Sequence, residues 1–328
     1  MNGNVLLPVS IDGRWGLIND RGEIVVEPNY DGAGGGIGIA YIKNASNLVV
    51  VDFRGQELHS VNGVKTYCEF SEQMLSVEIG TEWTYLCADG RLMPTRYAIC
   101  RDFHGGFAAV EDFDGRWGLI DRDGNWVIEP KFEEALDFDP ISKWLPVMRS
   151  GRWEMVNLSG QIARLNATDV LPSGNGFYGV EVEIKGGRDE RTLYGIIDAD
   201  LNWAIPPQFP EMALPGPDNV SVRDGDSWIN IGFDGQVRFR SDATFLGSVF
   251  CGLARAYVNG TVTANGLAGG KFAFVDTRGK LTIDPKYDDA FDFRNGVAEV
   301  GVFLDDTNTS WGYINVDGKE LWPPSRRQ

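Results

Sequence analysis

The feature that most constrains the fold of this chain is an internal repeat. Residues 13–22 return with few changes as residues 115–124, and the two copies stay in step through residues 27–30 and 129–132. A short unit that recurs along a chain is typical of an array of small structural units, each of which buries its apolar face against the next. The repeat therefore predicts one array with a continuous core.

Nine copies are found when each is placed by an anchor, which we define as the residue at the position of Trp15. Eight of the nine anchors are aromatic, eight are followed seven residues later by Gly, and seven are followed four residues later by Asp or Asn. Residues 1–328 are expected to form a single repeat domain. Its anchors are Trp15, Leu48, Trp83, Trp117, Trp153, Tyr194, Trp228, Phe272 and Trp311.

The spacing within a copy predicts a β-hairpin. Asp or Asn at the first position of a turn can accept hydrogen bonds from the backbone that follows, and Gly three positions later adopts the left-handed conformation of a bulged hairpin. Proline thirteen residues after the anchor then ends the second strand, because it cannot donate to a ladder. An aromatic residue follows this proline by two positions in four copies: Tyr30, Phe132, Phe209 and Tyr287.

A third strand with alternating apolar residues precedes each hairpin, as in residues 297–300. The fold expected is all-β, a tandem array of about nine three-stranded antiparallel meanders. Because propeller blades usually have four strands and the anchors are irregularly spaced, we favour a solenoid-like superhelix. A closed β-propeller-like ring is the alternative, since the chain begins in a third-type strand and ends after a second-type strand.

The pattern resembles that of the WG-repeat family of bacterial proteins. The shared signature is a basic residue, Trp-Gly, two apolar residues, a turn led by Asp or Asn and containing Gly, and an ending with proline, an aromatic residue and acidic residues. The resemblance covers about residues 5–324 and is strongest in copies one, four and nine. It implies an all-β array that acts as a binding or interaction module, without a common ligand or catalytic chemistry.

Charge narrows the classes of partner. The chain has 30 basic and 47 acidic side chains and a net charge of −17. A surplus of this sign argues against binding to nucleic acid and to anionic membranes, and favours a basic partner. The N-terminal residues show no signal peptide, no apolar run is long enough to span a bilayer, and the four cysteines lack a paired spacing. A cytoplasmic location is expected.

Few residues could carry catalysis. His59 and His104 are the only histidines and belong to no metal-binding motif, so neither a metal nor a cofactor is expected. The glycine-rich segments 32–38 and 266–272 do not have the spacing of phosphate-binding loops, and we interpret both as flexible loops. An enzyme is therefore not expected.

Two features are candidates for partner binding. Acidic residues follow the second strand of several copies and would form a stripe on one side of the array. The segments before the anchors of copies six, eight and nine are long, and insertions in repeat proteins often lie on the binding face. The candidate binding residues are Glu133, Glu134, Glu211, Asp288, Asp289, Asp292, Arg188, Asp189, Asp305 and Asp306.

These observations predict a non-enzymatic protein-binding module that is a monomer when unbound and whose partner is another, basic protein. One specific form of this hypothesis is an immunity protein, which neutralises a bacterial toxin by direct binding. The alternative is a carbohydrate or cell-wall binding module, in which Trp126, Trp144 and Trp203 would supply stacking surfaces.

Overall fold

The computed structural model describes residues 4–184, 191–264, 266–305 and 307–324. Those residues form β-strands and connecting turns, as the repeat predicted, and none of them is in a helix. No helix of the length and apolarity needed to cross a bilayer is found within these ranges. The contacts divide the chain into two compact units, Met1–Asn166 and Ala167–Gln328, which are described in turn.

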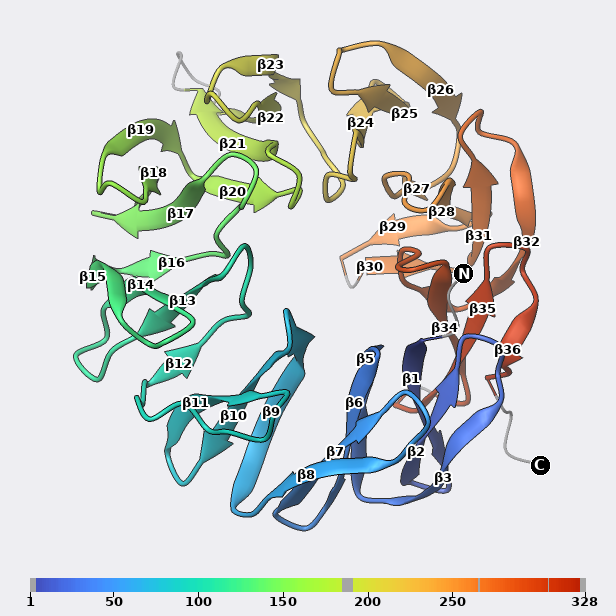
Figure 1. Cartoon of the computed structure of the whole chain (residues 1–328). Coiled ribbons are helices and arrows are strands. Elements are labelled where there is room, and N and C mark those ends of the chain that lie inside the picture. Colours follow the sequence, from blue (N-terminus) through green and yellow to red (C-terminus); the bar gives the residue numbers. More distant parts are fainter. Residues whose placement is uncertain (1–3, 185–190, 265, 306, 325–328) are drawn as a thin grey trace. The chain divides into compact units, whose positions relative to one another are not determined.

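Unit 1 contains five antiparallel sheets, numbered here in chain order (Figure 1). Sheet 1 consists of β1 (Val5–Ile11), β2 (Arg14–Asn19), β3 (Ile24–Tyr30) and β5 (Gly36–Ile37). Sheet 2 consists of β4 (Gly32–Gly34), β6 (Ile39–Asn44), β7 (Asn47–Asp52) and β8 (Glu57–Val61), and sheet 3 of β9 (Val64–Ser71), β10 (Met74–Ile79) and β11 (Glu82–Cys87). Sheet 4 consists of β12 (Ile99–Cys100), β13 (Phe107–Glu111), β14 (Trp117–Asp121) and β15 (Trp126–Phe132), and sheet 5 of β16 (Glu134–Ala135), β17 (Trp144–Arg149), β18 (Arg152–Asn157) and β19 (Ile162–Ala167).

Unit 2 contains four further sheets and a separate hairpin. Sheet 6 consists of β20 (Asp169–Pro172), β21 (Tyr178–Ile184), β22 (Arg191–Ile197) and β23 (Trp203–Phe209), and sheet 7 of β24 (Asn219–Asp224), β25 (Ser227–Gly232) and β26 (Val237–Ser241). Sheet 8 consists of β27 (Phe245–Leu246), β28 (Leu253–Val258), β31 (Lys271–Asp276) and β32 (Leu281–Tyr287), and the hairpin of β29 (Thr261–Thr263) and β30 (Gly266–Ala268). Sheet 9 consists of β33 (Asp289–Ala290), β34 (Val297–Phe303), β35 (Thr309–Asn315) and β36 (Glu320–Trp322).

Most of the observed sheets have one strand more than the three-stranded meander that was predicted for each copy. Seven of the nine sheets in the described ranges have four strands, because a strand of two to four residues pairs with the free edge of the meander. Sheet 4 is typical, with β12 paired to the end of β13 through Ile99–Glu111 and Cys100–Val110. These added strands are too short to show an alternating apolar pattern.

A four-stranded antiparallel meander is the blade of a β-propeller. Within each unit successive meanders follow one another as blades do, so the structure matches the propeller-like alternative. The solenoid-like superhelix was wrong, and the reason is the count of strands. One argument against a propeller was that its blades have four strands, and the short fourth strand of seven sheets in the described ranges removes it.

The predicted hairpin turns are confirmed. In the first copy, Asn19 Oδ1 accepts hydrogen bonds from the backbone N–H groups of Arg21 and Glu23, each at 3.0 Å. Gly22 then adopts a φ of +82°. The same two bonds recur at Asp52, Asp121, Asn157, Asp198, Asp276 and Asn315.

In copies one, four, six and nine, the glycine that follows the anchor lies against the neighbouring strand. A Cβ atom on Gly118 would lie 2.6 Å from the carbonyl oxygen of Ile128, and one on Gly16 would lie 2.4 Å from that of Val26. The ladder slips here, between the pairs Trp117–Phe132 and Leu119–Ile128 in sheet 4. The slip brings the second strand against the residue after the anchor, so a small residue fits there: glycine in sheet 4, and Ala273 at the same slip in sheet 8.

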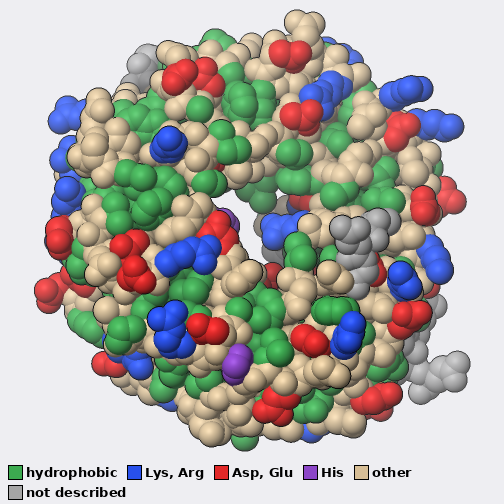
Figure 2. All heavy atoms as spheres, viewed as in Figure 1, with side chains coloured by type: hydrophobic (Ala, Val, Ile, Leu, Met, Phe, Trp, Pro, Cys, Tyr) green, Lys and Arg blue, Asp and Glu red, His purple; other side chains and the backbone are tan. Residues whose placement is uncertain are grey.

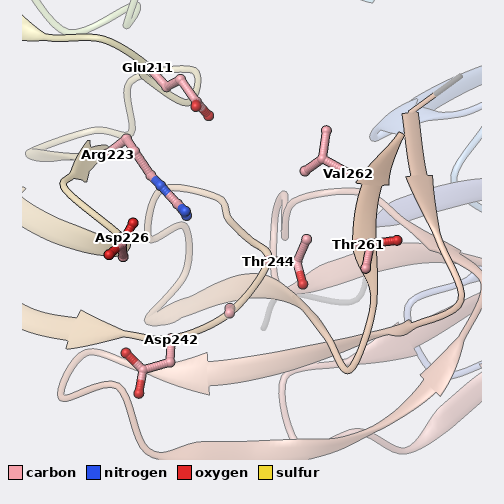
Figure 3. A pocket seen from close by; sticks show the side chains of 8 residues that line it. Glu211, Arg223, Asp226, Asp242, Thr244, Thr261 and Val262 are labelled. Atoms are coloured by element: carbon pink, nitrogen blue, oxygen red, sulfur yellow. The ribbon is translucent and has the colours of Figure 1, made fainter. Parts of the chain in front are cut away.

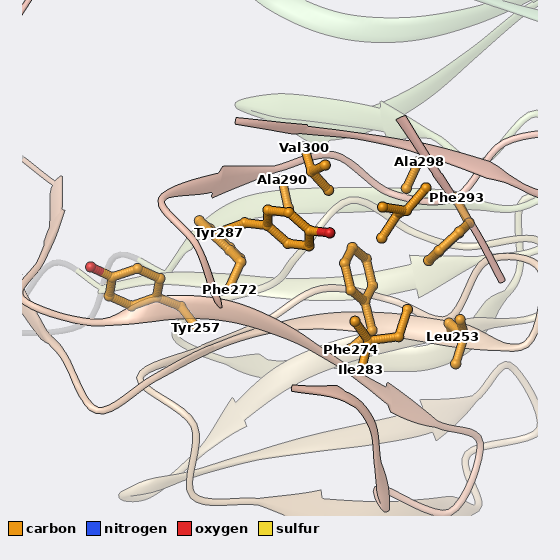
Figure 4. Close-up of a cluster of buried hydrophobic side chains, with 11 residues drawn as sticks. Leu253, Tyr257, Phe272, Phe274, Ile283, Tyr287, Ala290, Phe293, Ala298 and Val300 are labelled. Atoms are coloured by element: carbon orange, nitrogen blue, oxygen red, sulfur yellow. The ribbon is translucent and has the colours of Figure 1, made fainter. Parts of the chain in front are cut away.

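The apolar core lies between adjacent sheets of a unit. Clusters of buried side chains in the described ranges each join two consecutive sheets, and anchors such as Trp117 and Phe272 belong to them. Figure 4 shows the cluster between sheets 8 and 9, in which Phe274 from β31 packs edge to face on Phe293 at a centroid distance of 4.9 Å. Face-to-face packing of this kind makes each sheet depend on its neighbours.

The glycine-rich segments are ordered strands, contrary to the prediction of flexible loops. Residues 32–37 form β4 and β5, which pair with sheets 2 and 1. A Cβ atom on Gly34 would lie 2.0 Å from the ring of Tyr41, so the absence of a side chain permits close packing there. Likewise, residues 266–268 form β30.

Candidate functional site: a pocket between sheets 7 and 8

In the regular copies, the first acidic residue after the second strand caps the hairpin of the next sheet. Asp31 Oδ2 accepts a hydrogen bond from the backbone N–H of Ala45 at 2.7 Å. Glu133 accepts from Ser150 and Gly151, at 2.9 and 3.0 Å, and Asp288 accepts from Phe303 at 3.1 Å. We call Asp31, Glu133 and Asp288 the capping carboxylates.

The basic residue of the repeat signature is the partner of the capping carboxylate. Arg14 forms an ion pair with Asp31, and Lys271 forms one with Asp288. The hydrogen bond from Ala45 and the charge of Arg14 lower the pKa of Asp31. The N–H groups of Gly151 and Ser150 lower the pKa of Glu133. Two of the predicted binding residues, Glu133 and Asp288, are thus engaged within the fold.

Other carboxylates predicted to bind a partner also have partners in the structure. Glu134 lies 3.5 Å from Arg101, and Asp289 Oδ1 accepts a hydrogen bond from the backbone N–H of Ala290 at 2.8 Å. Asp292 pairs with Arg255 at 3.0 Å, and its burial raises its pKa.

The remaining predicted residues lie in the long segments before the anchors. Asp305 Oδ1 accepts hydrogen bonds from Asn308 and Thr307, which lower its pKa to about 2, so it stabilises its own loop. Three residues lie outside the described ranges: Arg188, Asp189 and Asp306. On the face shown in Figure 2, acidic side chains are interspersed with basic and hydrophobic ones.

The seventh copy departs from the repeat at three linked positions. Ser227 stands before its anchor, where the signature has a basic residue. Thr244 stands at the position of the capping carboxylates, because its N–H donates to Tyr257 in the next sheet as that of Glu133 donates to Met148. Ala243 consequently stands where Phe132 and its equivalents place an aromatic ring.

The strand pairing of sheet 7 differs as well. β25 and β26 pair without the usual slip, through Trp228–Ser241, Ile229–Arg240 and Asn230–Phe239. No bulge presses on the residue after the anchor, and that position holds the larger Ile229. The loss of the bulge, the aromatic ring and the capping carboxylate leaves a space at the junction with sheet 8.

That space is a pocket of about 370 Å³ (Figure 3). Its acidic side chains come from three segments: Glu211 precedes β24, Asp226 lies in the turn from β24 to β25, and Asp242 follows β26. The described residues that line it are Glu211, Arg223, Asp226, Asp242, Ala243, Thr244, Thr261 and Val262. Glu211 is the one predicted binding residue that lines it.

Charges of both signs face this pocket without direct pairing. Figure 3 shows Arg223 extending from β24 into the space that Glu211, Asp226 and Asp242 surround. In the described ranges, no ion pair of 4.0 Å or less joins Arg223 to any of these three carboxylates. The guanidinium carbon of Arg223 lies 5.9 Å from the ring centre of Trp228. The pocket therefore presents one cation and three anions to a ligand.

The hairpin formed by β29 and β30 is one wall of the pocket. Its base is fixed on sheet 8, because Thr244 Oγ1 donates to the carbonyl of Gly260 at 2.8 Å and the N–H of Gly270 donates to the hydroxyl of Tyr257 at 2.9 Å. Its strands carry exposed apolar side chains, Val262 at 71% and Leu267 at 37% exposure. This hairpin is the predicted insertion before the eighth anchor, and it borders the candidate site.

A buried polar network lies beside the pocket, between sheets 7 and 8. Asn219 donates to the carbonyl of Val249 and accepts from its N–H, at 2.9 and 2.8 Å. Asn230 donates to Asn219 at 2.8 Å and to Ser221 at 3.0 Å. All three polar side chains are fully buried. Hydrogen bonds in this arrangement fix one relative position of the two sheets, since any displacement would leave buried polar groups unpaired.

Sequence reasoning missed Arg223, Asp226 and Asp242. The available signal was the set of departures in the seventh copy, where Ser227 and Thr244 replace a charged pair. Of the tryptophans considered for carbohydrate binding, Trp126 packs edge to face on Tyr97 at 5.8 Å, whereas Trp203 is 42% exposed. Among the described side chains, no group of three or more His, Cys, Asp or Glu residues is placed to hold a metal ion.

Comparison with known proteins supports the repeat assignment. The model of the family described as WG containing repeat matches residues 15–35, 117–153 and 272–302. The sequence has no match among curated proteins.

Solved structures with similar architecture share little sequence. BamB from Moraxella catarrhalis is 16% identical, with 85% of this chain and 90% of that chain covered and a TM-score of 0.44. Apo AztD from Citrobacter koseri is 12% identical, with 97% and 93% covered and a TM-score of 0.45. A structure of a eukaryotic initiation factor is 11% identical, with 97% and 84% covered and a TM-score of 0.46.

Proposed function

We propose that this WG-repeat protein acts without catalysis, by binding a basic segment of another protein at the pocket between sheets 7 and 8. The observation that carries the proposal is the position of the β29–β30 hairpin. It holds exposed apolar residues beside a pocket lined by Glu211, Asp226 and Asp242. An apolar surface next to carboxylates that form no ion pair with Arg223 combines the two features that a protein interface uses for affinity and for specificity.

The fixed base of the hairpin supports this function. Because Thr244 and Tyr257 already hold the hairpin, little conformational entropy is lost when a partner docks on it. The net charge of −17 would further accelerate the encounter with a basic protein.

The test is affinity capture from the native host with the full chain as bait. Changing Glu211, Asp226 and Asp242 to Lys should abolish the capture of basic proteins that wild type retains. The matched control changes Asp200, Asp284 and Asp317 to Lys, three exposed residues of unit 2 that do not line the pocket. It alters the net charge equally and should preserve capture. Equal capture by both variants and wild type would refute the proposal.

A toxin-neutralising immunity protein is one form of this function. In that form, co-expression with a basic toxin encoded next to this protein should protect the cells, and the Lys variant of the pocket should not. Full toxicity in the presence of the wild-type chain would exclude this form and leave the broader proposal to the capture experiment.

A further inference from the structure

We infer that the pocket binds the C-terminal residue of a partner protein, and that this residue is Arg or Lys. The inference rests on the proposed function and specifies its ligand. It follows from the presence of both charge signs in one pocket, because a C-terminal basic residue carries a carboxylate and a cation on the same residue.

Arg223 is suited to the terminal carboxylate. A guanidinium group offers a planar pair of N–H donors that matches a carboxylate in a bidentate arrangement. The backbone of Arg223 is fixed in β24, where it pairs with Trp228, and its side chain lies within cation–π range of that indole. Its guanidinium group thus faces the pocket from a fixed base, and no carboxylate of the lining neutralises it directly.

The three carboxylates are suited to the basic side chain. Glu211, Asp226 and Asp242 approach the pocket from separate segments, so an ammonium or guanidinium group between them can donate hydrogen bonds to more than one carboxylate. The same carboxylates would repel an anion that arrives alone. A carboxylate accompanied by its own cation meets both requirements, and this distinguishes a C-terminal basic residue from an acidic one.

The hairpin favours a polypeptide over a free amino acid. Val262 lines the pocket and Leu267 pairs with it across the hairpin, so both lie next to the position of the bound residue. A free amino acid would leave this apolar surface exposed. The residues that precede a C-terminal Arg or Lys can cover it, and we expect them to be apolar.

The test measures binding of defined peptides to the full chain by isothermal titration calorimetry. The probe is acetyl-Gly-Val-Val-Arg with a free carboxylate. Its C-terminal amide and a peptide with Gln in place of Arg should each bind at least about tenfold more weakly, because each loses a charge-assisted contact. Free L-arginine should also bind at least about tenfold more weakly, since it lacks the apolar residues.

Two arginine variants test whether Arg223 binds the terminal carboxylate of the peptide. Arg223→Gln should remove the preference for the free carboxylate over the amide, while Arg240→Gln should preserve it. Arg240 is a matched control because it pairs with Asp224 at 2.9 Å and does not line the pocket. The comparison of acid and amide peptides on the wild-type chain needs no variant, so an unstable Arg223→Gln protein would leave the test intact.

The outcomes separate this inference from the proposed function. Equal binding of acid and amide peptides, with the Gln peptide weaker, would overturn the C-terminal assignment and leave a site for internal basic segments. Binding of free L-arginine as tight as that of the peptide would assign the pocket to a small molecule and overturn the inference. Absence of binding by every peptide, with capture from the host still dependent on the pocket carboxylates, would refute the inference alone.

Discussion

Sheets 4 and 5 in unit 1 and sheets 7 and 8 in unit 2 are equivalent pairs of neighbours that are joined in different ways. Between sheets 4 and 5 lies an apolar cluster that includes Trp117 and Phe132, and Glu133 caps the next hairpin. Between sheets 7 and 8, an apolar cluster is supplemented by the network of Asn219 and Asn230. The repeat is complete in the first pair and incomplete in the second.

The difference shows how a repeat protein can gain a site. A complete copy uses its aromatic ring and its capping carboxylate to close the junction with the next sheet. Replacing these residues by Ala243 and Thr244 opens a space, and the buried amides then secure the junction. Departures from the repeat therefore mark the candidate site more specifically than the excess of acidic residues.

The largest effect should come from removing the aromatic ring of the complete pair. Phe132 is buried within the apolar cluster, so Phe132→Ala should lower the free energy of unfolding by about 4 kcal/mol. Urea denaturation followed by Trp fluorescence measures this loss. In the seventh copy, Ala243 already occupies the position of Phe132. If Phe132→Ala lowers the free energy of unfolding by less than about 1 kcal/mol, the aromatic ring does not distinguish the two pairs of sheets.

The polar network of the incomplete pair should be next in importance. Asn219→Ala would remove the side-chain partner of the buried N–H and carbonyl of Val249 and leave Asn230 with its bond to Ser221 alone, which should cost about 3 kcal/mol. The control Asn202→Ala changes an exposed side chain in the same unit and should cost less than about 0.5 kcal/mol. Urea denaturation measures the free energy of unfolding of both variants. Equal stability of the two variants would show that the polar network does not stabilise the junction between sheets 7 and 8.

Adding a side chain at the glycine after the anchor should lower the stability of the fold because the added atoms would collide with the neighbouring strand. Gly118→Ala places a methyl group against the carbonyl of Ile128 and should cost about 2 kcal/mol. Gly151→Ala meets no atom within 4 Å but must keep a φ of +69°, so its cost should be about 1 kcal/mol. A smaller loss for Gly118→Ala than for Gly151→Ala, read from urea midpoints, would contradict the role of the bulge.

The smallest effect should be a pH dependence at the capping carboxylate. The pKa of Glu133 is lower in the folded chain than the ordinary value of 4.5 for this side chain, so the carboxylate stabilises the fold above about pH 4.5. That contribution is lost as the pH falls through the folded pKa. Glu133→Gln should therefore unfold at lower urea than wild type at pH 7, and the two midpoints should converge near pH 3. If the difference between the two urea midpoints stays constant from pH 7 to pH 3, the charge of Glu133 does not stabilise the hairpin that it caps.

The sequence predicted those parts of the fold that depend on local chemistry. The turns at Asn19 and its equivalents follow from an Asx residue and a glycine at fixed spacing, and the structure has them. The fourth strand, present in seven of the nine sheets of the described ranges, was missed, because a strand such as β16 has two residues and is defined only by its pairing with β17. Pairing over this distance leaves no periodic pattern in the sequence.

Only part of the candidate site was predicted, because some of its residues come together only in the folded chain. Glu211 and the insertion that forms β29 and β30 were recognised, since both stand out along the chain. Arg223 and Asp242 were missed, because they converge only when sheet 7 folds. The roles of Glu133 and Asp288 were also hidden, since each caps a hairpin that follows it by 15 residues or more.

The capping carboxylates also define the boundaries of the unit that can be duplicated. Arg14 stands in sheet 1, Asp31 in the connection, and the hairpin that Asp31 caps belongs to sheet 2. A duplicated gene segment that encodes one sheet alone would separate Asp31 from the hairpin that it caps. A segment from the basic residue before one anchor to the turn of the following hairpin keeps them together. Lengthening such a protein by design should therefore copy units offset from the sheets, such as residues 14–46.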